Sequence, residues 1–149
     1  MGLLRGIGSL LVGFLLLPML MRIALVAVGA VWPDLVGPAA DTAAVGAAGV
    51  DGPAVDLPTP SGGFMALNLG LTFVMAAVSA TVTAILAPEP PYLWVLLLGF
   101  LVFAGGLVFG IQQVGGPAPT WYLLALPLTS GVAIAVGGWA YLRRRDAAG

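Results

Sequence analysis

The chain has 149 residues, of which 60% are hydrophobic and 7% are charged, whereas charged residues make up about 25% of an average soluble protein. A water-soluble globule of this length has too little interior to hide so much apolar surface, so the composition predicts an integral membrane protein. The formal net charge of −1 offers no basic surface for nucleic acid, and the absence of Cys and His excludes disulfides, thiolate nucleophiles and histidine or thiolate metal sites.

Four apolar stretches are long enough to cross a bilayer. The hydrocarbon core is about 30 Å thick, so a helix that crosses it needs about 20 mostly apolar residues. Each stretch should be helical, because an isolated strand would leave its backbone polar groups unsatisfied in lipid. The sequence therefore predicts an all-α bundle of four transmembrane helices in a single domain, residues 1–149, with spans at about 7–32, 63–87, 92–111 and 121–141.

The first predicted span contains Pro18 and a charged residue, Arg22. A cleaved signal peptide is the alternative interpretation, because the small residues at 28–30 fit a cleavage pattern. However, Pro18 and Arg22 interrupt the apolar core, and that core exceeds the usual length of about 7 to 15 residues, so we expect a retained span. Arg22 lies ten residues before Trp32, or about 15 Å at helical rise, which places it near the bilayer midplane.

The partner of Arg22 is open at the level of sequence, because none of the six acidic residues lies in a predicted span. Thr72, Thr129 and Ser130 lie at similar depth, so their hydroxyls, with carbonyls, water or lipid phosphate, are one possible surrounding for the guanidinium. A carboxylate or cofactor of another subunit is a second possibility, and an anion or substrate in a transport path is a third. Lipid or a partner would turn Arg22 outward, whereas a transport site would point it into the bundle.

The first connection, residues 33–62, is rich in Ala, Gly, Pro and Asp and offers little to bury. We expect it to be poorly ordered on its own in water. Its acidic residues Asp34, Asp41, Asp51 and Asp56 follow one another at spacings of seven, ten and five, which match no calcium-binding loop. The expectation is a solvated acidic loop without a metal.

Small residues recur in the later spans at spacings typical of helix packing. Such residues let helix backbones approach closely, which drives association where lipid removes the hydrophobic contribution. They recur every seven residues in the second span and as pairs four residues apart in the third and fourth. The predicted packing positions are Gly70, Ala77, Ala84, Gly106, Gly110, Gly131 and Ala135. Ala133 and Gly137 form a second pair in the fourth span.

The distribution of arginines predicts the orientation. Arg5 precedes the first span and Arg143, Arg144 and Arg145 follow the fourth, so the positive-inside rule places both termini in the cytoplasm and the long first loop outside it. The short proline-rich turn between the second and third spans should form a tight hairpin in which Glu89 is solvated. Aromatic residues should mark the two interfaces, namely Trp32, Trp121 and Tyr122 on one side and Tyr92, Trp94, Trp139 and Tyr141 on the other.

Two stretches, "ATVTAILAPEPPYLWVLLLGFLVFAGG" and "WYLLALPLTSGVAIAVGGWAYLRRR", resemble a loose group of small, uncharacterised bacterial four-span membrane proteins. In that group the second span often ends in an Ala-Pro turn and the last in Gly-Gly-Trp before basic residues, as at Gly137 to Trp139. The resemblance covers roughly the C-terminal 80 residues, and Glu89 departs from it because the turn has no basic residue. It implies a bacterial inner (cytoplasmic) membrane and no known activity.

The spans offer few groups for catalysis, since general acid–base chemistry uses His, Lys, Cys, Tyr or a tuned carboxylate in a cleft. We therefore expect no enzyme, no catalytic residue and no bound cofactor. The expected function is a non-catalytic accessory or assembly subunit of a larger bacterial membrane complex, in contact with lipid and with other membrane subunits or further copies of itself. The alternative is a small homo-oligomeric transporter or channel for an anionic or lipidic substrate, with Arg22 lining the path. A lipid-modifying enzyme is a more distant alternative.

Overall fold

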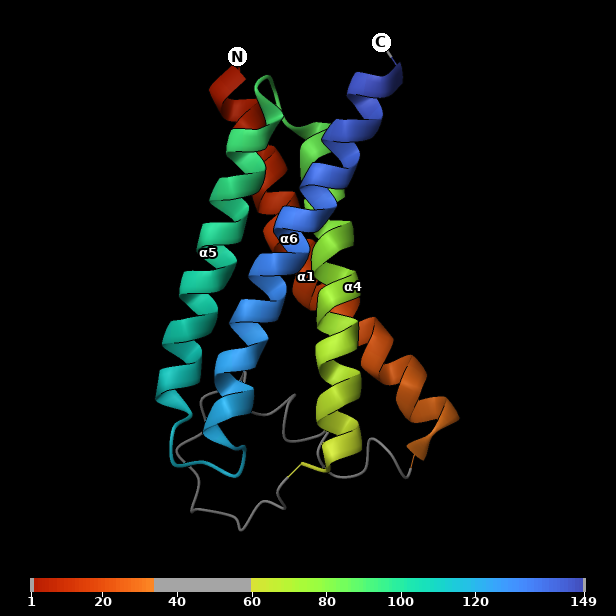
Figure 1. The fold of residues 1–149 in the computed structure, drawn as a ribbon, viewed down its shortest axis with the longest axis vertical. Coiled ribbons are helices and arrows are strands. Elements are labelled where there is room, and N and C mark those ends of the chain that lie inside the picture. The colour runs from red at the N-terminus through yellow and green to blue at the C-terminus, as the bar shows by residue number, and fades with distance from the viewer. Residues whose placement is uncertain (1, 34–59, 149) are drawn as a thin grey trace.

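The computed structural model describes residues 2–33 and 60–148, and this part of the chain folds into four α-helices (Figure 1). They are α1 (Gly2–Val31), α4 (Gly62–Leu86), α5 (Pro91–Gln112) and α6 (Thr120–Ala148). All four are long and apolar enough to cross a membrane. This confirms the prediction of an all-helical chain with four candidate membrane spans. Most of the 33–62 connection, with its four aspartates, lies outside the described residues.

Both ends of the chain lie at one end of the bundle, together with the short turn between α4 and α5; we call this the termini end (Figure 1). The opposite end, where the connection 113–119 joins α5 to α6, is called the loop end. Local signals fix the helix boundaries: the Ser61 side chain caps α4 by accepting a hydrogen bond from the Phe64 amide at 3.2 Å, and Pro91 occupies the first position of α5. Gly115, at φ +91°, supplies the left-handed residue of the α5–α6 connection.

A close backbone contact joins α4 and α6. A Cβ at Gly137 would lie only 2.8 Å from the Ala77 Cα, so glycine is required for the two backbones to come this close. Thr81 donates to the Ala77 carbonyl at 2.9 Å and also faces the Gly137 carbonyl at 3.5 Å. The core around this contact is built from small residues of α4 and α6 and a few larger ones: Ala76, Ala80, Ala84, Val95, Leu98, Ala133 and Ile134.

The helix α1 is buried against this core mainly through its first half. Its buried residues are Gly6, Ser9 and Gly13, a stripe of small side chains on one face. Gly6 packs against the indole of Trp94, and the Gly13 carbonyl accepts a hydrogen bond from the hydroxyl of Ser79. Small residues thus bring the α1 backbone into contact with α4 and α5 at the termini end.

Beyond Pro18, α1 leans away from the other helices (Figure 1). Its side chains there are largely uncovered, with exposed fractions of 63% for Met19 and 72% for Val26. The bundle is therefore closed at the termini end and parted at the loop end, where α1 is separated from its neighbours.

Polar contacts join the segments at the termini end. The Arg5 Nε donates to the Leu86 carbonyl at the end of α4 at 3.2 Å. Arg145 forms an ion pair with Glu89 in the α4–α5 turn, and the Arg143 guanidinium lies 5.2 Å from the ring centre of Trp139. Glu89 is 73% exposed, so it is solvated as the sequence predicts, but it also connects the turn to α6.

Five of the seven predicted packing positions contact a neighbouring helix in the structure. A Cβ at Gly106 would meet Pro127 at 2.9 Å, and one at Gly110 would meet the Leu123 carbonyl oxygen at 3.1 Å. Ala77, Ala84 and Gly131 also contact neighbouring helices.

Gly70 and Ala135 are exposed instead, so they do not pack against the other helices of this chain. Gly70 lies towards the loop end, where nothing is within 4 Å of the position of its missing Cβ. On α6, residues two positions apart point to nearly opposite sides of the helix, so the burial of Ala133 and Gly137 turns Ala135 outward.

Candidate functional site

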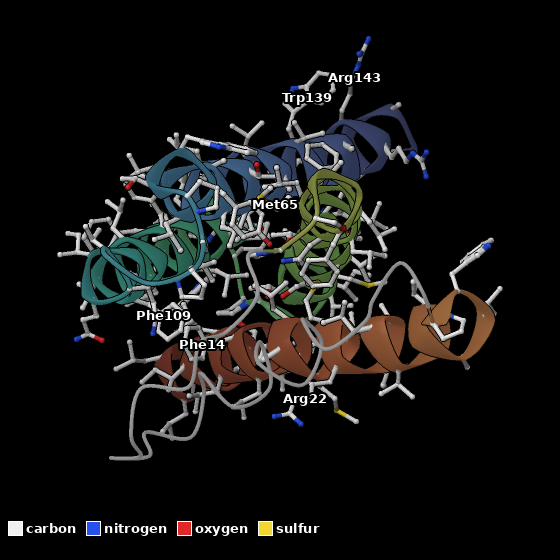
Figure 2. All side chains as sticks on the ribbon, turned by 90° about the horizontal axis from the view of Figure 1, so that it is seen from below. Phe14, Arg22, Met65, Phe109, Trp139 and Arg143 are labelled. Atoms are coloured by element: carbon white, nitrogen blue, oxygen red, sulfur yellow. The ribbon has the colours of Figure 1, made fainter. Side chains whose placement is uncertain are left out.

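Arg22 lies on the outer surface of the bundle. Its side chain is exposed and projects from α1 away from the other three helices (Figure 2). Among the described residues, no hydrogen bond or ion pair involves Arg22. The backbone of Arg22 lies ten residues before Trp32, about 15 Å along α1, and a charge this far from the end of a membrane-spanning helix needs an anionic or polar partner.

The three hydroxyl residues named as one possible surrounding of Arg22 form no hydrogen bond with it in the described part of the chain. Thr72 is buried, and its hydroxyl points to the sulfur of Met21 at 3.9 Å. Met21 and Arg22 are consecutive residues and so lie about 100° apart around the helix. Because Met21 faces α4, Arg22 is turned outward, away from Thr72.

The other two hydroxyls are on α6. The Ser130 hydroxyl donates to the carbonyl of Leu126 at 2.8 Å and also faces that of Pro127 at 3.1 Å, so its donor is used within its own helix. Thr129, the preceding residue, is partly buried, and no hydrogen bond links it to Arg22 among the described residues. The structure therefore brings Thr72 and Ser130 together around one cleft and leaves Arg22 on the other side of α1.

That cleft opens where α1 parts from the bundle. It has a volume of about 180 Å³, is partly open, and is bounded by all four helices. Its walls are almost entirely apolar, and the two hydroxyls of Thr72 and Ser130 are its main polar groups. The lining residues are Leu17 and Met21 of α1, Thr72 of α4, Val102, Gly106, Phe109 and Gly110 of α5, and Leu123, Leu126, Pro127 and Ser130 of α6.

A polar pair, Asn68 and Tyr122, lies close to this cleft towards the loop end. Asn68 precedes Thr72 by one helical turn on α4, and Tyr122 is next to Leu123, which lines the cleft. The Asn68 Nδ2 donates to the Tyr122 hydroxyl, while the Asn68 Oδ1 is buried without a hydrogen-bond partner. In a membrane an unpartnered acceptor is costly, because lipid offers no replacement for water.

This pair was missed by sequence reasoning. Tyr122 was expected to be an interfacial aromatic beside Trp121, but the tyrosine is only 5% exposed whereas Trp121 is 57% exposed. The signal that could have found the pair is Asn68 itself, the one amide side chain in the interior of a predicted span, because polar residues inside membrane helices usually contact another helix or a ligand.

No protein-family model, curated protein or solved structure matches the chain. The resemblance to small bacterial four-span proteins therefore stays a prediction. Within the described residues, no group of three or more His, Cys, Asp or Glu could hold a metal ion. Two features remain from which a function can be argued: the outward face of α1 with Arg22, and the apolar cleft with the Asn68–Tyr122 pair.

Proposed function

We propose that this protein is a non-catalytic accessory or assembly subunit of a larger complex in the bacterial inner membrane, with both termini in the cytoplasm. In this proposal α1 binds a transmembrane helix of another subunit, and a carboxylate on that helix pairs with Arg22. The observation that supports it is the outward position of Arg22 on the half of α1 that leaves the bundle.

The energetic argument begins with the cost of the charge. An arginine near the bilayer centre costs from about 3 to more than 10 kcal/mol, depending on how it is measured, unless water, lipid phosphate or an opposite charge compensates it. An exposed guanidinium on a helix that has left its neighbours is accessible to such a partner. A carboxylate at the same depth removes the charge from contact with lipid hydrocarbon and forms strong, paired hydrogen bonds with the guanidinium.

Charge complementarity favours a different chain over a second copy of this one. The acidic residues of the sequence are Asp34, Asp41, Asp51, Asp56, Glu89 and Asp146, and none lies within α1, α4 or α5 or in the apolar part of α6. Another copy would therefore add a second arginine without a counter-ion at the same depth. A partner helix with an Asp or Glu near its middle supplies what this chain lacks.

The partner helix has a suitable surface along α1. Gly8, Leu15 and Arg22 recur at seven-residue intervals, and Leu11 and Val26 lie beside them with exposed fractions of 52% and 72%. A seven-residue repeat keeps one face of a helix against a neighbour over several turns. The transport alternative has less support, because Arg22 points away from the interior of the chain, so a path lined by it would have to run between copies.

The test is mass spectrometry of the protein purified from its native membrane in a mild detergent. We expect a stoichiometric set of unrelated subunits. Recovery of the direct partner should fall by about tenfold or more in Arg22→Leu, because the partner carboxylate is left buried and unpaired, and fall less in Arg22→Lys, which keeps the charge.

Arg144→Leu is the matched control, since it removes an exposed arginine near the end of α6 instead of one in the membrane interior. Its partner recovery should equal that of the wild type. A monomer or pure homo-oligomer, or equal recovery with Arg22→Leu, would contradict the proposal. A homo-oligomer whose anion flux in liposomes disappears with Arg22→Leu would instead support the transporter alternative.

A further inference from the structure

We propose that the outer half of α1, residues 19–31, is a strap that bends at Pro18 and closes against α4, which shuts the lateral opening of the cleft. The structure shows this strap in a parted position (Figure 1). The inference goes beyond the proposed function and does not depend on it, because it concerns contacts within this chain alone. It rests on the hinge, on the unfilled cleft beside the strap and on the register of α1 against α4.

Pro18 separates two halves of α1 that are held very differently. Proline has no amide hydrogen, so the helix loses one backbone hydrogen bond there and bends more easily. Before this point, the hydrogen bond from Ser79 to the Gly13 carbonyl fixes α1 to α4. After it, the contact of the Thr72 hydroxyl with the Met21 sulfur, at 3.9 Å, is the hydrogen bond that joins α1 to α4 among the described residues. The first half is therefore an anchored base, and the second half is free to move.

Met21 holds the strap apart, and the cleft provides space into which its side chain can turn. The side chain lines the cleft, which has apolar walls and a volume of about 180 Å³. An apolar cavity of about 150 Å³ admits benzene, so this cleft has room for one thioether chain. Methionine is unbranched and has three rotatable bonds, so it adapts readily to such a space. Once Met21 fills the cleft, α1 can approach α4, and the cleft walls gain the dispersion contacts that they lack while it is unfilled.

The register of the two helices predicts where the strap docks. Met21 lies opposite Thr72, and the helices run in opposite directions, since α1 begins and α4 ends at the termini end. Seven residues make about two helical turns, so Val28 continues the face of Met21 and Met65 continues that of Thr72. Docking without a shift of register therefore pairs Val28 with Met65. In the parted position the end of α1 lies clear of the start of α4 (Figures 1 and 2).

The first measurement uses the full chain in nanodiscs of phosphatidylethanolamine and phosphatidylglycerol, with one copy in each disc. The sequence has no cysteine, so Val26→Cys with Val74→Cys introduces the only two thiols. Both side chains are exposed, 72% and 53%, and lie outside the proposed contact. Spin labels on them report the separation of α1 from α4 by double electron–electron resonance. We expect two distances, one for the parted and one for the docked strap, and a single distance would overturn the proposal.

A second measurement traps the docked strap. Val28→Cys with Met65→Cys should form a disulfide within the chain under a mild oxidant, because docking brings the two Cβ atoms to the required separation of about 3.5–4.5 Å. Met21→Trp enlarges the side chain that holds the strap apart, so it should slow this reaction by about tenfold or more. Met19→Trp is the matched control on an exposed position of the same helix, and it should change the rate by less than about twofold.

A rigid α1 would give different results. Absence of the disulfide in the protein that keeps Met21, or equal rates in Met21→Trp and Met19→Trp, would overturn the strap. Circular dichroism and gel filtration check that each variant keeps its helices. If Met21→Trp fails to fold, the spin-label distances in the protein that keeps Met21 decide.

The hinge has a test of its own. Pro18→Ala restores the missing backbone hydrogen bond and stiffens α1, so the two spin-label distances should become one. Two distances that stay unchanged in this variant would overturn the role of Pro18.

Discussion

The two ends of this bundle differ in how completely they are packed. At the termini end, the buried hydroxyls of the described residues have partners: Ser9 donates to the Gly6 carbonyl at 2.7 Å, Ser79 to that of Gly13, and Thr83 to that of Ser79 at 3.0 Å. Towards the loop end, one buried amide oxygen lacks a partner, a cleft separates the helices, and a charged residue faces outward. Close packing and satisfied hydrogen bonds hold helices together in lipid, so the half that lacks them is the half available for binding.

The change of side-chain size along α1 explains the difference. On the face turned to the other helices, Gly6, Ser9 and Gly13 are followed by Leu17 and Met21, each about one turn after the last. The small residues allow backbone contact, while the two large ones hold α1 at a distance and form a wall of the cleft. The parting of the bundle is therefore built into the α1 sequence, close to Pro18.

The largest effect that tests this comparison is expected at Gly13. A Cβ there would collide with the Thr83 hydroxyl and lie 3.2 Å from a methyl group of Leu98, so Gly13→Leu has no room at the termini end. Overpacking of this kind costs about 1–3 kcal/mol, and more where the backbone must shift. We expect a loss of that size in the free energy of unfolding, measured by denaturation in mixed micelles.

Gly70→Leu is the matched change towards the loop end. Nothing lies within 4 Å of the position of its Cβ, so the larger side chain should enter lipid and leave stability unchanged or slightly higher, because leucine is the better helix former. Equal destabilisation by the two substitutions would show that the ends do not differ in packing as described.

The exposed position of Gly70 also shows which part of this fold the sequence could not predict. The four helices were predictable because length and hydropathy alone define a membrane span. The face of each span that is buried was not predictable, because lipid and protein interior are equally apolar. No hydrophobic stripe therefore identifies the side of the helix that faces the core. Small-residue spacing was the remaining guide. It did not indicate that Gly70 and Ala135 face away from the other helices of the chain, and it overlooked the α1 stripe of Gly6, Ser9 and Gly13.

The candidate sites were predictable to different degrees. The sequence singled out Arg22 by its charge, which is unusual in the middle of a membrane helix. The outward direction of its side chain could not be predicted, because it follows from the contact of Met21 with α4. The Asn68–Tyr122 pair joins residues 54 positions apart, and nothing in either helix alone indicates that they meet. Contacts between helices of this kind follow from the packing angle, which the sequence of one helix does not reveal.

A smaller effect is expected from removing one interhelical hydrogen bond. The Ser79 hydroxyl donates to the Gly13 carbonyl of α1, so Ser79→Ala should lower the free energy of unfolding by about 0.6 kcal/mol, and by no more than about 1.7, as for other hydrogen bonds between membrane helices. Ser130→Ala is the control, because that hydroxyl bonds only to carbonyls of its own helix and its loss should change stability by less than about 0.5 kcal/mol. The same unfolding assay measures both, and an equal loss in the two variants would argue against Ser79 as a link between α1 and α4.

The smallest effect concerns the ion pair between Glu89 and Arg145, which joins the α4–α5 turn to α6 outside the apolar spans. Both side chains are well exposed, 73% and 48%, so water and salt screen the pair and its coupling should not exceed about 1 kcal/mol. Because Arg145 also interacts elsewhere, a single substitution would measure more than this pair, and a double-mutant cycle with Glu89→Gln and Arg145→Gln isolates the coupling.

The coupling should decrease further as salt is raised towards 1 M, where the screening length falls to about 3 Å. A coupling well above 1 kcal/mol that does not change with salt would mean that the ion pair stabilises this turn. A weak, salt-dependent coupling would mean that the small-residue contacts stabilise the termini end and that Glu89 can be replaced at little cost.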